Sequence, residues 1–183
     1  MSMQPRIVAL TGSPGTGKTT LASRLLNQGV KVITLEDAAE RVDALSHVEG
    51  ELEVETSKLA EWKWEGNDHC VIDGHLSHHC PINAVIVLRC HPLELRRRLE
   101  QRTDYGPEKV GSNVEWELIS GVWADLIVLH PQAKVIEIDT TEQEIPIDAV
   151  LDFILKAEPS TSVEEFITDS IDWIGTGNDA ESI

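Results

Sequence analysis

A glycine-rich stretch near the start of the chain restricts its possible folds most strongly. Residues 12–19 read GSPGTGKT, after an apolar run and before a helical pattern of leucines. Strand, glycine loop and helix in this order form a phosphate cradle, because glycines let successive N–H groups turn inward and the helix start adds unpaired ones. In such a loop Lys18 reaches the β- and γ-phosphates of a nucleotide, and the Thr19 hydroxyl binds Mg²⁺. The alternative is a glycine-rich turn with a surface lysine, which the flanking elements disfavour.

Five apolar runs predict strands, and helical patterns lie between most of them. The runs are residues 7–10, 30–35, 70–73, 84–89 and 134–139. This alternation predicts an α/β fold, a doubly wound sheet of five parallel strands with helices on both faces.

Two further segments do not fit the bare core of strands and helices. Residues 36–68 hold 11 acidic and 3 basic residues, and residues 102–113 are polar and turn-prone. We interpret both as insertions at the carboxyl ends of strands, where ligands bind in open sheets. The second is expected to be a mobile lid or else an ordinary surface connection. In the first, Asp37 is expected to cap a helix that begins at Ala38.

The composition indicates a single acidic domain. The 183 residues include 15 basic and 32 acidic side chains, a net charge of −17. Such a surface disfavours broad nucleic-acid binding and attracts basic partners, although it is also typical of proteins adapted for solubility or a salty cytoplasm. No run is long enough to cross a membrane and no signal peptide is apparent, so we expect a cytoplasmic protein. Cys70, Cys80 and Cys90 are expected to be core thiols in a reducing compartment.

A second acid is expected beside the glycine loop. Asp73 ends an apolar run and is the best candidate in the chain for holding the Mg²⁺ shell; the alternative is an ordinary aspartate at the start of a loop. His75 could orient a water molecule or a phosphate, although a histidine near a strand end is more often structural. Zinc is also suggested by His75, His78, His79 and Cys80, but their spacing lacks a paired ligand set, which disfavours a zinc site.

Arginines form the chain's only basic cluster. Arg89 ends a predicted strand and Arg102 opens the predicted lid, so both are placed to clamp phosphates during transfer. The remaining members, of which at least one is expected to be plain solvent charge, are Arg96, Arg97 and Arg98.

These motifs together resemble the adenylate kinase isoenzyme 6 type, a family found in archaea and in eukaryotic nuclei. The similarity covers most of residues 5–156. It rests on residues 11–20 (TGSPGTGKTT), 71–75 (VIDGH), 85–90 (VIVLRC), 95–102 (LRRRLEQR) and 109–117 (KVGSNVEWE), and residues 170–173 also look like the archaeal branch.

The resemblance implies two activities. One is reversible phosphoryl transfer from ATP to AMP with Mg²⁺. The other is ATP hydrolysis coupled to maturation of the small ribosomal subunit, with a basic small-subunit ribosomal protein as partner. It also implies a P-loop nucleotide kinase domain over residues 1–157, with a monophosphate-binding insert at about 34–57 and a lid at about 101–112. The acidic, Ser/Thr-rich residues 158–183 are expected to form a tail that is partly disordered or docks late, with one short amphipathic helix.

The resemblance also implies site residues. Asp73, His75 and Arg102 join Lys18 as the catalytic set, and Thr19 and Asp73 hold Mg²⁺. The ATP contacts are Gly12, Gly15, Thr16, Gly17, Lys18, Thr19, Thr20 and Arg102, and the AMP contacts are Asp37, Arg41 and Arg89. The chain departs from the family where Arg102-Thr103-Asp104-Tyr105 replaces a shorter Arg-Gly-Tyr, and its insert holds few cations.

Overall fold

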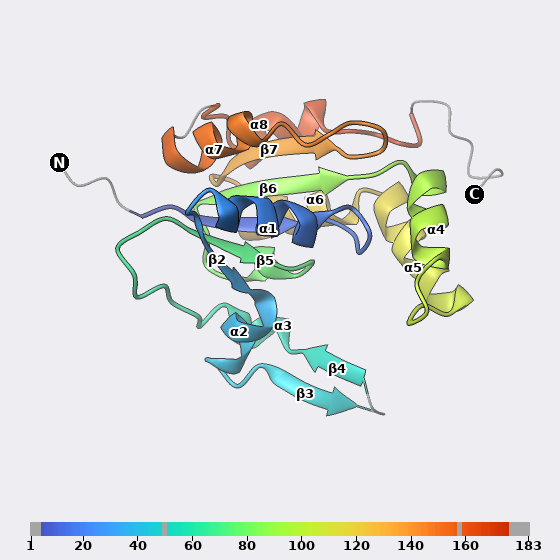
Figure 1. Cartoon of the computed structure of the whole chain (residues 1–183), viewed down its shortest axis with the longest axis horizontal. Helices are drawn as coiled ribbons and strands as arrows, with labels where there is room; N and C mark the ends of the chain where they lie inside the picture. The colour runs from blue at the N-terminus through green and yellow to red at the C-terminus, as the bar shows by residue number, and fades with distance from the viewer. Residues whose placement is uncertain (1–4, 49–50, 157–158, 176–183) are drawn as a thin grey trace.

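In the computed structural model, which describes residues 5–48, 51–156 and 159–175, five parallel strands form one sheet in the order β2-β5-β1-β6-β7 (Figure 1). They are β1 (Ile7–Thr11), β2 (Lys31–Thr34), β5 (Cys70–Asp73), β6 (Ala84–Arg89) and β7 (Lys134–Asp139). Each lies on a predicted run, so the predicted α/β sheet is confirmed. The chain winds outward in both directions from β1. The carboxyl end of β1 is therefore a switch point, where open sheets bind ligands.

Helices cover both faces of the sheet. In the described residues they are α1 (Lys18–Asn27), α2 (Leu35–Glu40), α3 (Thr56–Leu59), α4 (Pro92–Glu100), α5 (Pro107–Leu118), α6 (Gly121–Leu129), α7 (Ile147–Lys156), α8 (Val163–Phe166) and the short 3₁₀ helices η1 (Ser77–His79) and η2 (Ile167–Asp169). Val8 and Leu10 of β1 pack against α1 and α7, while Ala9 packs with β6 residues against α6 and α8. Because both faces are covered, the strands read as continuous apolar runs.

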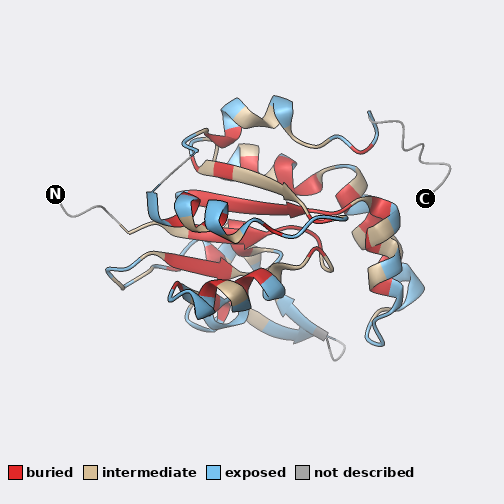
Figure 2. Cartoon of the chain, turned by 45° about the horizontal axis from the view of Figure 1, so that its top comes forward, coloured by how far each residue is buried: buried red, intermediate tan, exposed pale blue. Residues whose placement is uncertain are grey.

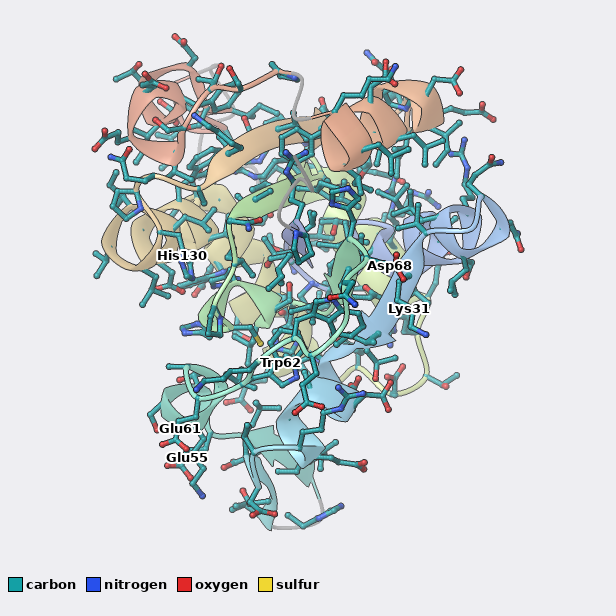
Figure 3. The ribbon with its side chains drawn as sticks, turned by 90° about the vertical axis from the view of Figure 1, so that its left-hand side faces the viewer. Lys31, Glu55, Glu61, Trp62, Asp68 and His130 are labelled. Atoms are coloured by element: carbon teal, nitrogen blue, oxygen red, sulfur yellow. The ribbon has the colours of Figure 1, made fainter. Side chains whose placement is uncertain are left out.

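The insertion after β2 forms a small layer of its own. It contains α2, α3 and an exposed antiparallel hairpin of β3 (Leu45–Val48) and β4 (Glu51–Val54), as Figure 2 shows. Trp62 is buried between this layer and the sheet, whereas Glu55 and Glu61 lie on its outer side (Figure 3). The prediction that Asp37 caps a helix starting at Ala38 is wrong. Thr34 is the cap: its Oγ1 accepts the Asp37 N–H at 3.0 Å, and the Asp37 carboxylate accepts the Thr34 N–H at 3.3 Å.

The predicted lid is mostly helical, contrary to its turn-prone composition. The helix α5 begins at Pro107, and only the residues just before it form a turn. Val110 and Val114 of α5 pack against Leu95 and Leu99 of α4 at the carboxyl edge of the sheet. This burial outweighs the helix cost of Gly111, which is on the order of 1 kcal/mol.

The chain after α7 packs on the core. The predicted boundary at residues 157 and 158 lies outside the described residues. Beyond it, Ser162 bridges to Lys134 at the edge of β7, α8 covers the sheet, and Trp173 is buried. In this tail the short helix α8 runs on into η2, and residues 173–175 form a turn. No helix in the described part of the chain has the length and apolar character that a membrane crossing requires.

Candidate functional site

Two glycines give the loop after β1 its shape. Gly12 has φ 132°, and a Cβ there would lie 2.2 Å from the Leu88 carbonyl oxygen, so the loop can press against β6 only with glycine. Gly17 has φ 96°, which side-chain-bearing residues rarely adopt. Thr16 is buried, and its Oγ1 donates to the Ser13 carbonyl at 2.8 Å. Gly12 and Thr16 thus determine the shape of the loop from its buried side.

A cleft of about 800 Å³ opens at the carboxyl edge of the sheet, within the range of ligand sites. Its walls come from the loop and α1, the insertion, the turn after β5, and the α4–α5 pair. The sequence-predicted residues that line it are Gly15, Gly17, Lys18, Thr19, Thr20, Asp73, His75 and Arg102. Sequence reasoning assigned no role to its other lining residues, which are Pro14, Thr34, Glu36, Leu52, Gly74, Tyr105, Lys109 and Asn113.

Lys18 is the cation at the floor of the cleft. Its Nζ donates to the carbonyl oxygens of Gly12 and Ser13, each at 2.9 Å. Burial lowers the Lys18 pKa to about 8, and the nearby Asp73 carboxylate partly opposes that shift. The ammonium is therefore desolvated and directed toward the loop, as a phosphate-binding lysine must be.

Thr19 and Asp73 bring oxygen ligands together beside Lys18. Thr19 is exposed at the start of α1, near enough to the half-buried Asp73 carboxylate at the end of β5 to act on its pKa. Burial raises the Asp73 pKa, while Lys18 and Thr19 oppose the rise. A hydroxyl and a carboxylate next to a phosphate cradle are the hard donors that Mg²⁺ prefers, so these residues fit that ion.

His75 follows on the same turn and faces the same cleft. Although its side chain is partly open to solvent, the surrounding protein lowers its pKa, and Lys18 lowers it further. The imidazole is therefore neutral near pH 7 and can accept or donate a hydrogen bond to a water molecule or a phosphate oxygen.

Arg102 projects from the turn between α4 and α5. Its guanidinium lies 3.1 Å from the Asp104 carboxylate and 4.5 Å from the centre of the Tyr105 ring, and Lys109 Nζ lies 5.0 Å from that ring. Asp104 raises the Arg102 pKa above its already high value. Asp104 already pairs with Arg102, so a phosphate would have to compete with this carboxylate for the guanidinium.

Three predicted contacts do not reach the cleft. The Asp37 carboxylate completes the helix cap of α2, and Arg41 is exposed at the far end of that helix. Arg89 is fully buried: its Nε donates to Glu117 at 2.6 Å and its Nη1 to Glu137 at 2.8 Å. The prediction that Arg89 contacts a phosphate does not fit this geometry, because two buried carboxylates already neutralise its charge.

Glu117 links the loop to the buried arginine, a role that the sequence analysis missed. One carboxylate oxygen accepts from Ser13 Oγ at 2.7 Å, and the other accepts from Arg89 and, at 3.0 Å, from Trp173 Nε1. The spacing of Val110, Val114 and Glu117 on α5 places all three on one helix face and could have revealed the buried acid.

The chain is similar to known proteins. A family model described as an AAA domain matches residues 8–120. A Pyrococcus abyssi protein named "Putative adenylate kinase" is 41% identical over 140 residues, 75% of this chain and 76% of its own. A protein of the same name from Archaeoglobus fulgidus is 36% identical over 172 residues, 92% of each chain.

Solved structures share the fold. The TT1252 structure from Thermus thermophilus has a TM-score of 0.54 at 16% identity and covers 85% of this chain and 98% of its own. The YorR protein from Bacillus subtilis, solved in complex with phosphorylated GDP, has a TM-score of 0.51 at 15% identity and covers 90% of this chain and 99% of its own. At these identities the likeness concerns the fold alone.

Proposed function

The chain belongs to the adenylate kinase-like family of P-loop kinases, and from this premise we propose that it transfers the γ-phosphate of ATP to AMP. The observation that carries the proposal is the convergence of Lys18, Thr19, Asp73 and Arg102 on one cleft. Lys18 and Arg102 would neutralise the charge of the phosphoryl group during transfer. The oxygen atoms of Thr19 and Asp73 suit a divalent metal.

Positioning and charge neutralisation account for the reaction. The N–H groups of the loop and Lys18 would hold the triphosphate, and Thr19 and Asp73 would hold Mg²⁺, which supplies positive charge between the phosphates. Arg102 would release Asp104 and meet the charge that develops during transfer. No side-chain base is required, because the attacking phosphate oxygen is already ionised.

The acceptor side of the cleft contributes no cation from its described residues. The insertion lines it with Thr34, Glu36 and Leu52, which offer a hydroxyl, a carboxylate and an apolar surface. We therefore assign the acceptor phosphate to the wall that contains Arg102 and Lys109. The residues that the family resemblance implies for this role, Asp37, Arg41 and Arg89, do not line the cleft.

ATP affinity is expected to fall as the pH rises above about 8. In the nucleotide-free protein Lys18 has a pKa of about 8, so below this pH the triphosphate meets an ammonium. Above it, binding must first restore the proton, which weakens affinity by up to roughly tenfold per pH unit. Calorimetric titration with Mg²⁺-ATP across this range measures the slope. Lys18→Arg is the control, because arginine stays charged and should flatten the profile; identical slopes would exclude Lys18 as the cause.

ATP hydrolysis is the second candidate activity. It is favoured by the position of His75, whose neutral ring faces the same cleft as Lys18 and could orient an attacking water. The net charge of −17 suits a basic partner, and a small-subunit ribosomal protein is the one that the family resemblance suggests. If hydrolysis is the function, the basic protein partner, rather than AMP, would stimulate ATP turnover.

One coupled assay separates the two activities. We expect ADP to form from Mg²⁺-ATP much faster when AMP is present, with two ADP per ATP consumed and no net phosphate release. Phosphate release that is independent of AMP and rises on addition of a basic ribosomal protein would instead favour the hydrolysis function. Absence of both activities in folded protein that binds ATP would refute the enzyme assignment.

A further inference from the structure

A second group of ligand atoms lies beside the cleft, outside the machinery described above. We call it the His-His-Asp cluster: His78 and His79 from η1 and Asp125 from α6. The Asp125 Oδ2 atom lies 3.3 Å from His78 Nε2 and 3.7 Å from His79 Nε2. Two ligands of a tetrahedral ion with bonds of about 2.0–2.1 Å are separated by about 3.4 Å. Asp125 Oδ2 is thus spaced from each histidine nitrogen much as one ligand of an ion is from another, and the ligand atoms all lie within 4.8 Å of one another.

The surroundings fix the orientation of the His78 ring. Thr11 Oγ1 donates to the His75 carbonyl at 3.0 Å, so it accepts from His78 Nδ1, 2.8 Å away. When Nδ1 donates to Thr11, Nε2 of a neutral ring carries no proton and faces Asp125 Oδ2, 3.3 Å away; in the other tautomer Nε2–H donates to that carboxylate. A cation between the two atoms would take the place of that proton and bind both, and a hydrogen-bonded Nδ1 is the usual support of a metal-bound histidine.

Two further hydrogen bonds hold the backbone that carries both histidines. His130, labelled in Figure 3 near the end of α6, places its Nε2 2.9 Å from the His78 carbonyl oxygen. Ser77, the first residue of η1, is buried and donates to the Leu10 carbonyl at 3.2 Å. The ligand-bearing turn is therefore tied to both β1 and α6, and its geometry does not depend on a flexible loop.

We propose that the His-His-Asp cluster binds one divalent transition metal of the Zn²⁺ class, separate from the Mg²⁺ site. Two imidazole nitrogens and one carboxylate suit Zn²⁺, Co²⁺ or Ni²⁺, whereas Mg²⁺ prefers oxygen ligands throughout. Three protein ligands leave a coordination position for water or another ligand.

A pocket behind the glycine loop borders the cluster. The pocket has a volume of about 240 Å³, and its walls include His78 and Asp125 together with Pro14, His75 and Trp116. A small anion or a water molecule in this pocket could complete the coordination. The pocket shares Pro14, His75 and Asn113 with the nucleotide cleft, so a ligand on the metal would lie next to that cleft.

The thiols do not compete for the metal in the folded protein. Burial raises the pKa of Cys70 and Cys80 to about 12 and that of Cys90 to about 11, so all three stay protonated. A thiol binds metal as its thiolate. Zinc bound by the folded chain should therefore report histidine and carboxylate ligands.

The test is a titration of the full, untagged chain with Zn²⁺ alone against a chromophoric chelator, in excess Mg²⁺ and without nucleotide. We expect one saturable site, and we expect affinity to fall by roughly tenfold or more in His79→Ala and in Asp125→Asn. Both side chains are partly exposed, so both variants should fold. With Co²⁺ in place of Zn²⁺, the wild type should give the intense visible absorption of a tetrahedral site, and both variants should lose it.

Two control variants define the site. His47→Ala removes an exposed histidine on β3 and should leave Zn²⁺ affinity unchanged. Asp73→Asn disables the proposed Mg²⁺ ligand and should also leave it unchanged. The proposal is overturned if no stoichiometric site is found, or if His79→Ala and Asp125→Asn bind Zn²⁺ as tightly as the wild type. Loss of binding in Asp73→Asn alone would place the zinc in the nucleotide cleft instead.

Discussion

Replacement of Lys18 by Ala should lower the turnover number for ATP-dependent ADP formation by about 10²–10³-fold. Lys18 is the cation at the floor of the cleft, and its ammonium is directed at the loop carbonyls of Gly12 and Ser13. Such a desolvated charge stabilises the migrating phosphoryl group far more than an exposed one. Steady-state assays at saturating ATP and AMP measure the effect.

Lys58→Ala is the matched control for that experiment. Lys58 is an exposed lysine that pairs with Glu55 at 2.8 Å on the outer side of the insertion, so its loss should leave turnover unchanged. A Lys18→Ala enzyme that keeps more than about a third of wild-type turnover would contradict the proposed site, because no other residue at the floor of the cleft could supply the charge.

Replacement of Arg89 by Met should lower the free energy of unfolding by about 3–5 kcal/mol. Met fills much of the same volume but leaves the Glu117 and Glu137 carboxylates, which are 2% and 3% exposed, without their cation. A buried charge that loses its partner costs far more than the pair contributes when intact. Urea denaturation, followed by tryptophan fluorescence, gives the difference from the wild type.

Arg97→Met is the control that shows how much stability is lost when an exposed arginine is replaced by methionine. Arg97 also pairs with a carboxylate, Glu94, at 2.7 Å, but its side chain is 60% exposed. The cost there should stay below about 1 kcal/mol, because solvent replaces the lost interaction. Similar losses of unfolding free energy in both variants would show that burial of the Arg89 ion pairs does not account for their contribution to stability.

Local patterns predicted most of the sheet and the floor of the cleft. The glycine loop restricts its own backbone, so Lys18 and Thr19 could be placed from a short stretch of sequence. The position of Asp73 could be predicted because parallel strands end at one edge of the sheet and a phosphate cradle needs an acidic residue nearby. These are short-range or topological rules, and the structure brings the three residues together.

Predictions failed where distant residues decide the outcome. Arg89 does end its strand as predicted, but its partners Glu117 and Glu137 lie 28 and 48 residues away. No local pattern could show that this charge was already neutralised. The lid composition suggested a turn because it contains Pro107 and Gly111, yet packing of Val110 and Val114 on α4 makes it a helix.

The shared hydrogen bonds of Glu117 bear on how the protein is made. Ser13 is synthesised well before Trp173, yet both bind the same carboxylate. Because domains complete their cores only when all of their segments are available, the glycine loop cannot reach its final hydrogen bonding before Trp173 is available to fold. The ability to bind a nucleotide should therefore depend on a segment that is made long after the loop itself.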